Sequence, residues 1–385
     1  MPWLLIGKRD FLRNRESAAR PTTSFGSRRR IVWSASRSIE GSATVTLKCR
    51  YSQSGSLAIL GAHSPYNRRM TRKTTVLDLF AGAGGLSAGF RAASNTFETV
   101  RAVEWDNSAA ASYEATFGSG IIYAGDIKNW LAEDDVPEVD VIIGGPPCQG
   151  FSTLGKQDVE DERNDLWKEY AATIRRSKPK YFVIENVSEF RKSPQYEHFK
   201  EATSKGGALA DYGFKSEVLN AADYGAAQAR KRAVLIGYHR DFEFPGFPER
   251  THSATPESDG LLPHLTVADI LTDVPNVPDM DSKFGSRSYS FNGREFPGSF
   301  GTRELHWSRN YRDISLRRFA VIPPGGNRRD LEAYPELMTP CWTKHKSGSG
   351  DVMGRLHWER PAVTIRTEFF KPEKGRYLHP WKTGP

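Results

Sequence analysis

The chain has 385 residues, of which 38% are hydrophobic and 26% charged, and a formal net charge of +8. This length allows a sizeable core and two domains, and no apolar run approaches the ~18 residues that would cross a membrane. Three cysteines without a CxxC pair argue against a disulfide framework or a structural zinc site and indicate a reducing cytoplasm; they are Cys49, Cys148 and Cys341.

The first 70 residues are basic and show no sustained period of a helix or a strand. They hold 13 Lys/Arg and 3 Asp/Glu, so they account for the positive net charge, and the rest of the chain is nearly balanced. Their content of Ser, Arg and Gly predicts disorder. Because Met70 stands just before the first strand, a second interpretation is that translation starts there and that residues 1–70 are a mis-assigned extension.

Residues 74–240 alternate between strand and helix patterns. Strands are expected at 75–79, 99–103, 121–123, 139–143 and 181–184, and helices at 85–93, 107–117 and 166–177. Two further runs, 214–219 and 233–238, are expected to pair near the sheet edge. Alternating strands and helices predict an α/β fold with a mostly parallel sheet covered on both faces, and such sheets bind ligands at the carboxyl ends of their strands.

The chain changes character near residue 240, where Pro, Gly, Ser and Arg become more frequent and the strands become shorter. Residues 286–385 hold 18 Lys/Arg against 10 Asp/Glu, with aromatic residues scattered among them. This composition predicts a second, smaller and irregular domain at about 241–365, and its basic surface suits a phosphate backbone or is ordinary solvated surface.

A glycine-rich turn follows the first strand in LDLFAGAGGLSAGF, residues 77–90. Gly82 and Gly84 fit the dinucleotide pattern G-x-G-x-x-G, but Ser87 occupies the third position. Asp78, just before the turn, would repel a pyrophosphate, whereas it would favour a ligand that carries an ammonium and a sulfonium. The alternative is a tight connection between strand and helix without a ligand.

Acidic residues also follow the next two strands. Glu104 could accept hydrogen bonds from two ribose hydroxyls, Trp105 offers a flat face to an adenine, and Asp126 could accept from the adenine amino group. Three acids at successive strand ends resemble the S-adenosylmethionine pocket of class I methyltransferases. Each acid by itself also fits a helix cap or a surface charge.

A single thiol follows the fourth strand. Cys148 lies behind Pro146-Pro147, in a stiff loop that would position a nucleophile, although burial as a structural residue is the alternative. Glu185 stands at the end of the next strand, where it could meet the same substrate as Cys148. Gln228, Arg230 and Arg232 alternate, so we expect all three on one face of a strand.

Together these residues resemble the cytosine-5 DNA methyltransferase family, from about residue 74 to residue 380. The resemblance rests on an ordered set of motifs: Asp78–Gly85, Pro146-Pro147-Cys148-Gln149, Asn164-Asp165-Leu166, Glu185-Asn186-Val187 and Gln228-x-Arg230-x-Arg232. It implies a class I, Rossmann-like S-adenosylmethionine-dependent fold at 74–240, a target-recognition domain at 241–365 and a return segment at 366–385.

The resemblance also implies roles for the site residues. The Cys148 thiolate would add to C6 of a cytosine flipped out of double-stranded DNA, Glu185 would hold protonated N3, and Arg232 would bind O2, with Arg230 bracing the loop. No metal is implied. The cofactor-binding residues would be Asp78, Phe80, Ala81, Gly82, Gly85, Glu104, Trp105, Asp126, Ile127, Pro147 and Leu166.

The chain departs from the family pattern after His379-Pro380, where RE-x-x-R-L-Q-x-F-P and GN-x-V-P segments normally follow. Three interpretations stay open: an active enzyme, one half of a split enzyme completed by a second polypeptide, or a truncated product that binds S-adenosylmethionine and DNA. Two alternatives are a non-catalytic DNA-binding protein and an RNA methyltransferase. The family also implies a cognate restriction endonuclease and a place at the nucleoid, in the cytoplasm of a bacterium or archaeon.

Overall fold

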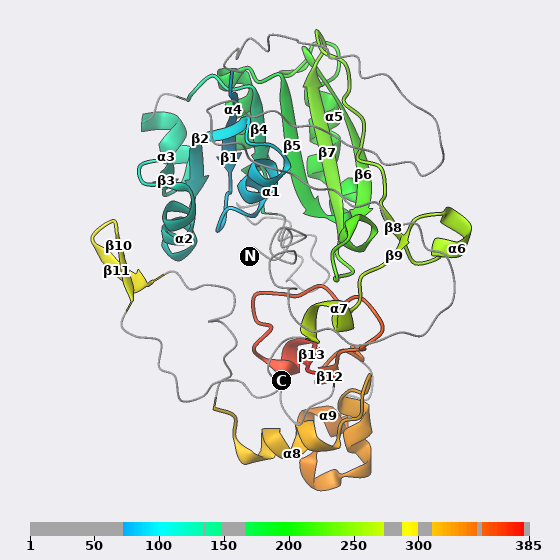
Figure 1. The fold of residues 1–385 in the computed structure, drawn as a ribbon. Helices are drawn as coiled ribbons and strands as arrows, with labels where there is room; N and C mark the ends of the chain where they lie inside the picture. The colour runs from blue at the N-terminus through cyan, green and yellow to red at the C-terminus, as the bar shows by residue number, and fades with distance from the viewer. Residues whose placement is uncertain are drawn as a thin grey trace, which may run out of the picture. The chain divides into compact units, whose positions relative to one another are not determined.

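The computed structural model describes residues 72–133, 136–147, 166–272, 287–298, 310–344 and 349–380 (Figure 1). Its first part is built on seven strands: β1 (Thr74–Leu79), β2 (Phe97–Glu104), β3 (Ile122–Ala124), β4 (Val141–Gly144), β5 (Tyr181–Val187), β6 (Tyr212–Asn220) and β7 (Lys231–His239). They form one sheet in the order β3-β2-β1-β4-β5-β7-β6. The five strands from β3 to β5 are parallel, and β7 is antiparallel to both β5 and β6. The predicted α/β class and the mostly parallel sheet are therefore confirmed.

Helices cover both faces of this sheet, because its strands alternate apolar side chains between two cores. Leu77 and Leu79 of β1 and Ile142 of β4 belong to one core, whereas Val76 and Ile143 belong to the other. The first core packs under three helices, α3 (Ile127–Glu133), α4 (Leu166–Ser177) and α5 (Pro194–Ala202). The opposite face carries α1 (Gly85–Ala93) and α2 (Asn107–Phe117).

Most elements agree with the sequence expectation, and three helices do so to the residue: α1, α2 and α4. Within residues 74–240 the sequence analysis did not predict two helices, α3 and α5. The hydrophobic residues of α5 are Tyr196 and Phe199, which form too short an apolar stripe to stand out within a charged segment. The strand β5 runs three residues beyond the expected end, because its pairing with β7 continues as far as Val187↔Arg232.

In the described residues beyond His239, all helices and strands are short. Beside β5 and β6 lie the 3₁₀ turns η3 (Ser188–Lys192) and η4 (Ala221–Tyr224). The later elements are β8 (His252–Ser253), α6 (Pro256–Asp259), β9 (Leu262–Pro263), α7 (Val267–Leu271), β10 (Ser288–Phe291), β11 (Arg294–Pro297), α8 (Asp313–Val321), η6 (Arg328–Ala333), η7 (Pro335–Leu337), α9 (Pro340–Lys344), β12 (Gly354–Arg355), η8 (Pro372–Lys374) and β13 (Arg376–Leu378). The hairpin β10–β11 packs on α2, where Phe291 joins a core with Ala81 and the Tyr289 hydroxyl donates to Glu114.

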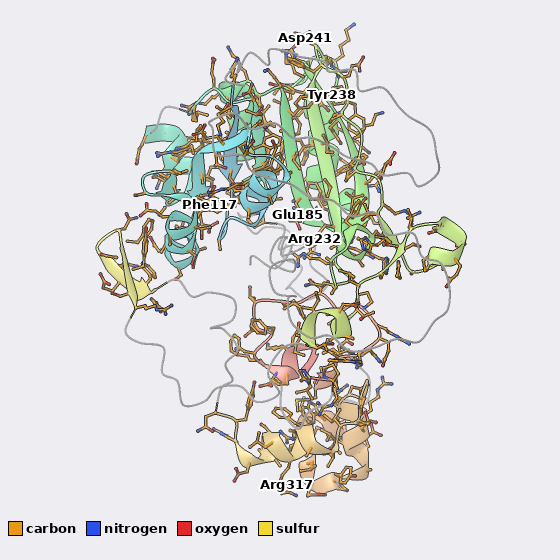
Figure 2. All side chains as sticks on the ribbon, in the orientation of Figure 1. Phe117, Glu185, Arg232, Tyr238, Asp241 and Arg317 are labelled. Carbon is orange, nitrogen blue, oxygen red and sulfur yellow. The ribbon has the colours of Figure 1, made fainter. Side chains whose placement is uncertain are left out.

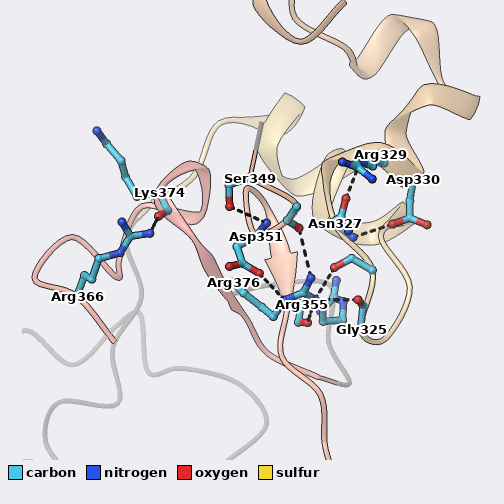
Figure 3. A network of polar contacts seen from close by, with 12 residues as sticks. Gly325, Asn327, Arg329, Asp330, Ser349, Asp351, Arg355, Arg366, Lys374 and Arg376 are labelled. Atoms are coloured by element: carbon cyan, nitrogen blue, oxygen red, sulfur yellow. Dashed lines mark hydrogen bonds and ion pairs between the residues drawn. The ribbon is translucent and has the colours of Figure 1, made fainter. Parts of the chain in front are cut away.

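A small separate core holds the last part together, and two buried arginines cross-link it (Figure 3). Arg355 Nε donates to the Ile322 carbonyl at 2.9 Å, and Arg376 Nη1 donates to the Arg355 carbonyl at 2.8 Å. Arg376 also contacts the Asp351 carboxylate at 3.1 Å. Backbone carbonyls thus accept hydrogen bonds from most donors of the two buried guanidinium groups, which compensates for their desolvation.

Among the described residues, no helix combines the length and apolar character needed to cross a membrane.

Candidate active site at the carboxyl edge of the sheet

The turn between β1 and α1 needs left-handed backbone at three positions, Phe80, Gly82 and Gly84. Gly84 has φ of 88°, and a Cβ there would lie 2.2 Å from the Phe117 ring, so only glycine fits. A Cβ on Gly82 would meet nothing within 4 Å. The turn is therefore packed against α2 on one side and open at Gly82, where a ligand has room.

Glu104 joins this turn to the end of β2. Its Oε2 accepts from the Gly82 N–H at 2.7 Å, and its Oε1 accepts from the Asp106 N–H at 2.8 Å. A carboxylate has about four acceptor positions, so Glu104 retains capacity for two hydroxyl donors. Trp105, the next residue, is 71% exposed. The Trp105 side chain is therefore accessible to a ligand beside Glu104, and the expected roles of both residues stay predictions.

Asp126 caps α3, as the structural interpretation of these acids predicted. Its Oδ1 accepts from the Lys128 N–H at 2.8 Å, while the Gly125 N–H ties the same corner to the Glu104 carbonyl at 2.9 Å. The cap leaves the carboxylate half-buried at the same sheet edge as Glu104. Ile127 is 4% exposed and belongs to the main core, so its side chain supports the corner from beneath.

Asp78 lies in the core below the glycine turn, and its expected contact with the cofactor stays a prediction. Its carboxylate is fully buried, and Oδ2 accepts from the Ser87 hydroxyl at 2.7 Å. The Ser87 oxygen also lies 2.8 Å from the Tyr113 hydroxyl. Burial raises the pKa of Asp78 to about 7, an effect that the Ser87 hydrogen bonds partly offset and the charge of Glu104 increases. Because Asp78 lies on the face of β1 toward α1 and α2, it is buried beneath the glycine turn.

Glu185 and two arginines meet on the last strands of the sheet (Figure 2 labels Glu185 and Arg232). The Glu185 Oε1 atom lies 2.8 Å from Arg232 Nε and 3.8 Å from Arg230 Nη2. All three side chains are partly exposed, at 31% for Glu185 and 21% for each arginine. Burial and the charge of Arg232 lower the pKa of Arg230, and the Glu185 carboxylate partly offsets both effects. The cluster therefore presents one acceptor and two cations to a ligand.

The segment before Cys148 runs beside Glu185. A Cβ on Gly145 would lie 3.3 Å from Glu185 Oε2, so the backbone there passes close to the carboxylate. The Asn186 side-chain amide donates to the Pro146 carbonyl at 2.9 Å and fixes the segment to β5. Pro147 is half-buried at the end of this stretch. Cys148 itself lies outside the described residues, as do Asn164 and Asp165.

Gln228 and Arg230 lie before β7 begins at Lys231, so the expected single strand face for Gln228, Arg230 and Arg232 is wrong. Gln228 instead forms an isolated parallel bridge with Ala362, and its Oε1 accepts from the Ile365 N–H at 3.2 Å. The long-range bridge draws the chain out of the sheet two residues before Arg230. Alternation in sequence could not reveal this, because the bridge partner, Ala362, is 134 residues away.

The remaining expected residues surround the glycine turn. Ala81 is buried in the core under α2, and Gly85 is exposed at the first position of α1. Phe80 and Leu166 are partly buried and pack against the main core. The glycine pattern by itself marks Ser87 only as a departure from a third glycine. Its place in the third glycine position, with a buried acid on β1, was the signal for the polar network that the structure shows.

Comparison with known proteins agrees with this geometry. The model of the family described as C-5 cytosine-specific DNA methylase matches residues 74–378. Type II methyltransferase M.XorII of Xanthomonas oryzae pv. oryzae is 34% identical over 288 residues, which cover 66% of this chain and 64% of that relative. Type II methyltransferase M1.HphI of Haemophilus parahaemolyticus is 32% identical over 308 residues, covering 77% of this chain and 72% of that protein.

One solved structure shows the same fold. It is a prophage-encoded protein of E. coli described as a DNA modification methyltransferase, with a TM-score of 0.52 and 22% identity over 81% of this chain and 85% of that one. The sheet and the family match define an α/β methyltransferase, and this chain belongs to the C-5 cytosine-specific DNA methylase family. The methyl donor of that family is S-adenosylmethionine. The alignment with M.XorII spans less than two thirds of that relative's length.

Proposed function

We propose that this chain transfers a methyl group from S-adenosylmethionine to C5 of a cytosine in double-stranded DNA. The observation that carries the proposal is the Glu185 carboxylate, held between Arg230 and Arg232 beside the backbone that leads to Cys148. A cytosine edge offers a carbonyl oxygen and a ring nitrogen that this cluster matches. Family membership supplies the reaction class.

The residues around the glycine turn fit the methyl donor. The open space at Gly82 admits a close approach of the ligand to the backbone, and the turn's left-handed residues shape it. Glu104 would accept from the ribose hydroxyls, Trp105 would stack on the adenine, and Asp126 would accept from the adenine amino group. Bound here, S-adenosylmethionine would supply an electrophilic methyl group. Asp78 would support the turn through Ser87.

Cytosine must be activated, because C5 is a weak nucleophile. We assign Cys148 to form a bond to C6 as its thiolate, which makes C5 electron-rich. Glu185 would keep N3 protonated as the electrons move into the ring, and Arg232 would bind the O2 carbonyl. After C5 has gained the methyl group, its proton passes to water. The electron pair of the C5–H bond then restores the C5–C6 double bond, and Cys148 leaves as a thiolate. The base must leave the duplex for this chemistry, at a cost of a few kcal/mol.

Arg230 would stabilise the negative charge of Glu185 and would also contact the phosphate of the flipped nucleotide. Residues 241–365 would read the DNA sequence, and phosphate contacts there would set the register. The named relatives are type II methyltransferases, so we propose a restriction-modification role. The further partner would be a cognate endonuclease or a second polypeptide with additional family segments. The place of action would be the nucleoid of a bacterial or archaeal cytoplasm.

The test is transfer of labelled methyl from S-adenosylmethionine to mixed-sequence duplex DNA, with RNA and the Cys148→Ala variant in parallel. We expect label in DNA that requires Cys148. Label in RNA and not in DNA would show that RNA is the substrate. Equal label with the Cys148→Ala variant would contradict Cys148 as the nucleophile. Binding of S-adenosylmethionine without any transfer, in the presence of diverse DNA, would contradict the enzymatic function of this chain.

A further inference from the structure

Two neighbouring phenylalanines stand exposed on a short turn near the end of the described chain. Phe369 is 52% exposed and Phe370 is 46% exposed, and their ring centroids lie 6.3 Å apart at an interplanar angle of 81°. Exposed aromatic rings that are adjacent and on an ordered turn present an apolar surface to a partner. Folding alone does not explain them, because neither ring lies in the core of this region.

The turn is fixed at its first end to residues 227–229, the segment just before Arg230 and β7. The Ala229 N–H donates to the Ala362 carbonyl at 2.8 Å, and the Ala362 N–H donates to the Ala227 carbonyl at 2.8 Å. The Thr364 hydroxyl adds a bond to the Ala229 carbonyl at 3.1 Å. Phe369 follows Thr364 by five residues, at most about 18 Å of extended chain. The rings are therefore tethered within reach of DNA bound at Arg230.

The second end of the turn is fixed to the small C-terminal core. The Tyr311 hydroxyl donates to the Phe370 carbonyl at 2.9 Å, and the Met353 N–H donates to the Pro372 carbonyl at 2.8 Å. Arg366 donates to the Tyr377 hydroxyl at 3.0 Å. It also donates to the Lys374 carbonyl, a contact that Figure 3 shows from close by. A turn held at both ends has little backbone entropy to lose when its rings meet a partner.

Two lysines, Lys371 and Lys374, follow the rings on the same turn. The Lys371 ammonium lies 5.4 Å from the Phe370 ring centroid, and Lys374 lies 3.6 Å from Glu368. Glu368 also contacts Lys371, and the two lysines lower the pKa of the Glu368 carboxyl. Residues 366–376 hold two arginines and two lysines against Glu368 and Glu373, which leaves a positive balance beside an apolar surface. That combination matches a nucleic acid, whose bases present flat apolar faces next to phosphates.

We propose that Phe369 and Phe370 form a base-stacking platform that inserts at the base step opened when the target cytosine leaves the duplex. This inference rests on the proposed function. Apolar side chains inserted between base steps offset the lost stacking of a distorted duplex. The pair would therefore be a positioning element: it holds the opened DNA without touching the reacting atoms, while Lys371 and Lys374 contact the backbone.

The test compares the affinity of the full chain for a short mixed-sequence duplex and for the same duplex with one abasic site. An abasic site removes the cost of opening a base step, so the unaltered chain should prefer it. We expect the double variant Phe369→Ala, Phe370→Ala to lose that preference, with affinity for the abasic duplex falling by about 5- to 150-fold per stacked ring. The substitutions Phe369→Trp and Phe370→Trp should retain it.

The matched control is Phe242→Ala, because Phe242 is also partly exposed but lies after β7, beside Tyr181. It should leave the preference unchanged. An unaltered chain without preference, or a double variant that loses affinity for both duplexes equally, would overturn the platform. A change of oligomeric state in the double variant would also contradict the platform, because it would show that the rings contact a second copy of this chain. The experiment measures binding only. Its outcome can therefore be interpreted even if the chain transfers no methyl group.

Discussion

At the scale of single residues, Asp78 carries a charge that opposes folding. Its pKa is raised from 3.8 to about 7, so the folded state holds the proton more tightly than the unfolded state. The stabilising contribution of protonated Asp78 is therefore complete below pH ~4 and is lost as the pH rises to about 7. Asp78→Asn removes this dependence while keeping an oxygen that can accept from Ser87.

We expect the free energy of unfolding of Asp78→Asn, relative to the unaltered chain, to rise between pH 5 and pH 8 by on the order of 2 kcal/mol. Urea unfolding at both pH values measures it. Asp140→Asn is the control, because the pKa of Asp140 is shifted in the opposite direction to that of Asp78. Burial raises the pKa of Asp140, but hydrogen bonds from Lys180 and Thr75 outweigh burial and lower it overall. Its effect should be the same at both pH values; a constant difference for Asp78→Asn would refute the prediction.

Glu185 is the residue on which the proposed chemistry depends most directly. Replacing Glu185 by Gln keeps its shape and an acceptor oxygen but removes the negative charge that would stabilise protonated N3. We expect kcat for methyl transfer to fall by about a hundredfold or more while DNA affinity is retained. Glu189→Gln, an exposed glutamate on η3, should have no effect. Unchanged turnover of Glu185→Gln in single-turnover assays would remove Glu185 from the mechanism.

At the scale of elements, β5 positions the loop that leads to Cys148 through one buried hydrogen bond. Asn186→Ala leaves the Pro146 carbonyl without its donor, at a cost of about 1–3 kcal/mol. Asn186→Asp should cost a similar amount, since a carboxylate cannot donate. Both variants should lower kcat more than they raise KM for S-adenosylmethionine. Thermal unfolding and steady-state kinetics measure the two effects, and wild-type behaviour of Asn186→Asp would contradict this role.

The bridge between Gln228 and residues 362–365 makes a sharper prediction. Gln228 accepts from the Ile365 N–H, and a glutamate can do the same, whereas alanine cannot. We expect Gln228→Glu to preserve amide hydrogen-exchange protection at Ile365 and Gln228→Ala to lower it by about fivefold or more, for a bond worth about 1 kcal/mol. Equal protection in both variants would show that the bridge depends on backbone bonds alone.

At the scale of the whole molecule, the excess positive charge lies in the first 70 residues, outside the part of the chain that matches the family. The family match begins at residue 74, and residues 1–70 hold 13 Lys/Arg against 3 Asp/Glu. We expect a chain that starts at Met70 to keep the thermal stability and S-adenosylmethionine affinity of the full chain. Its DNA affinity should depend less steeply on salt, because fewer counterions are released. A lower Tm would contradict this separation.

The sequence determined the fold class, because alternating strand and helix patterns with a glycine turn admit few topologies. It also placed the acids Glu104 and Asp126 at strand ends, where parallel strands bring them to one edge. For Asp78, the strand pattern did not show whether the side chain is buried or exposed to a ligand. Whether a residue at a strand end faces the ligand or the core depends on which helix covers it, and only α1 and α2 decide that.

The tertiary structure alone decided the contacts made between distant segments. Glu185 meets Arg230 and Arg232 because β7 runs antiparallel beside β5, a register that local pattern does not encode. Gln228 leaves the strand pattern because its partner, Ala362, belongs to a segment far along the chain. Local propensity acts over a few residues, whereas these pairings are set by the packing of the whole chain, and the tether of Phe369 and Phe370 follows from them.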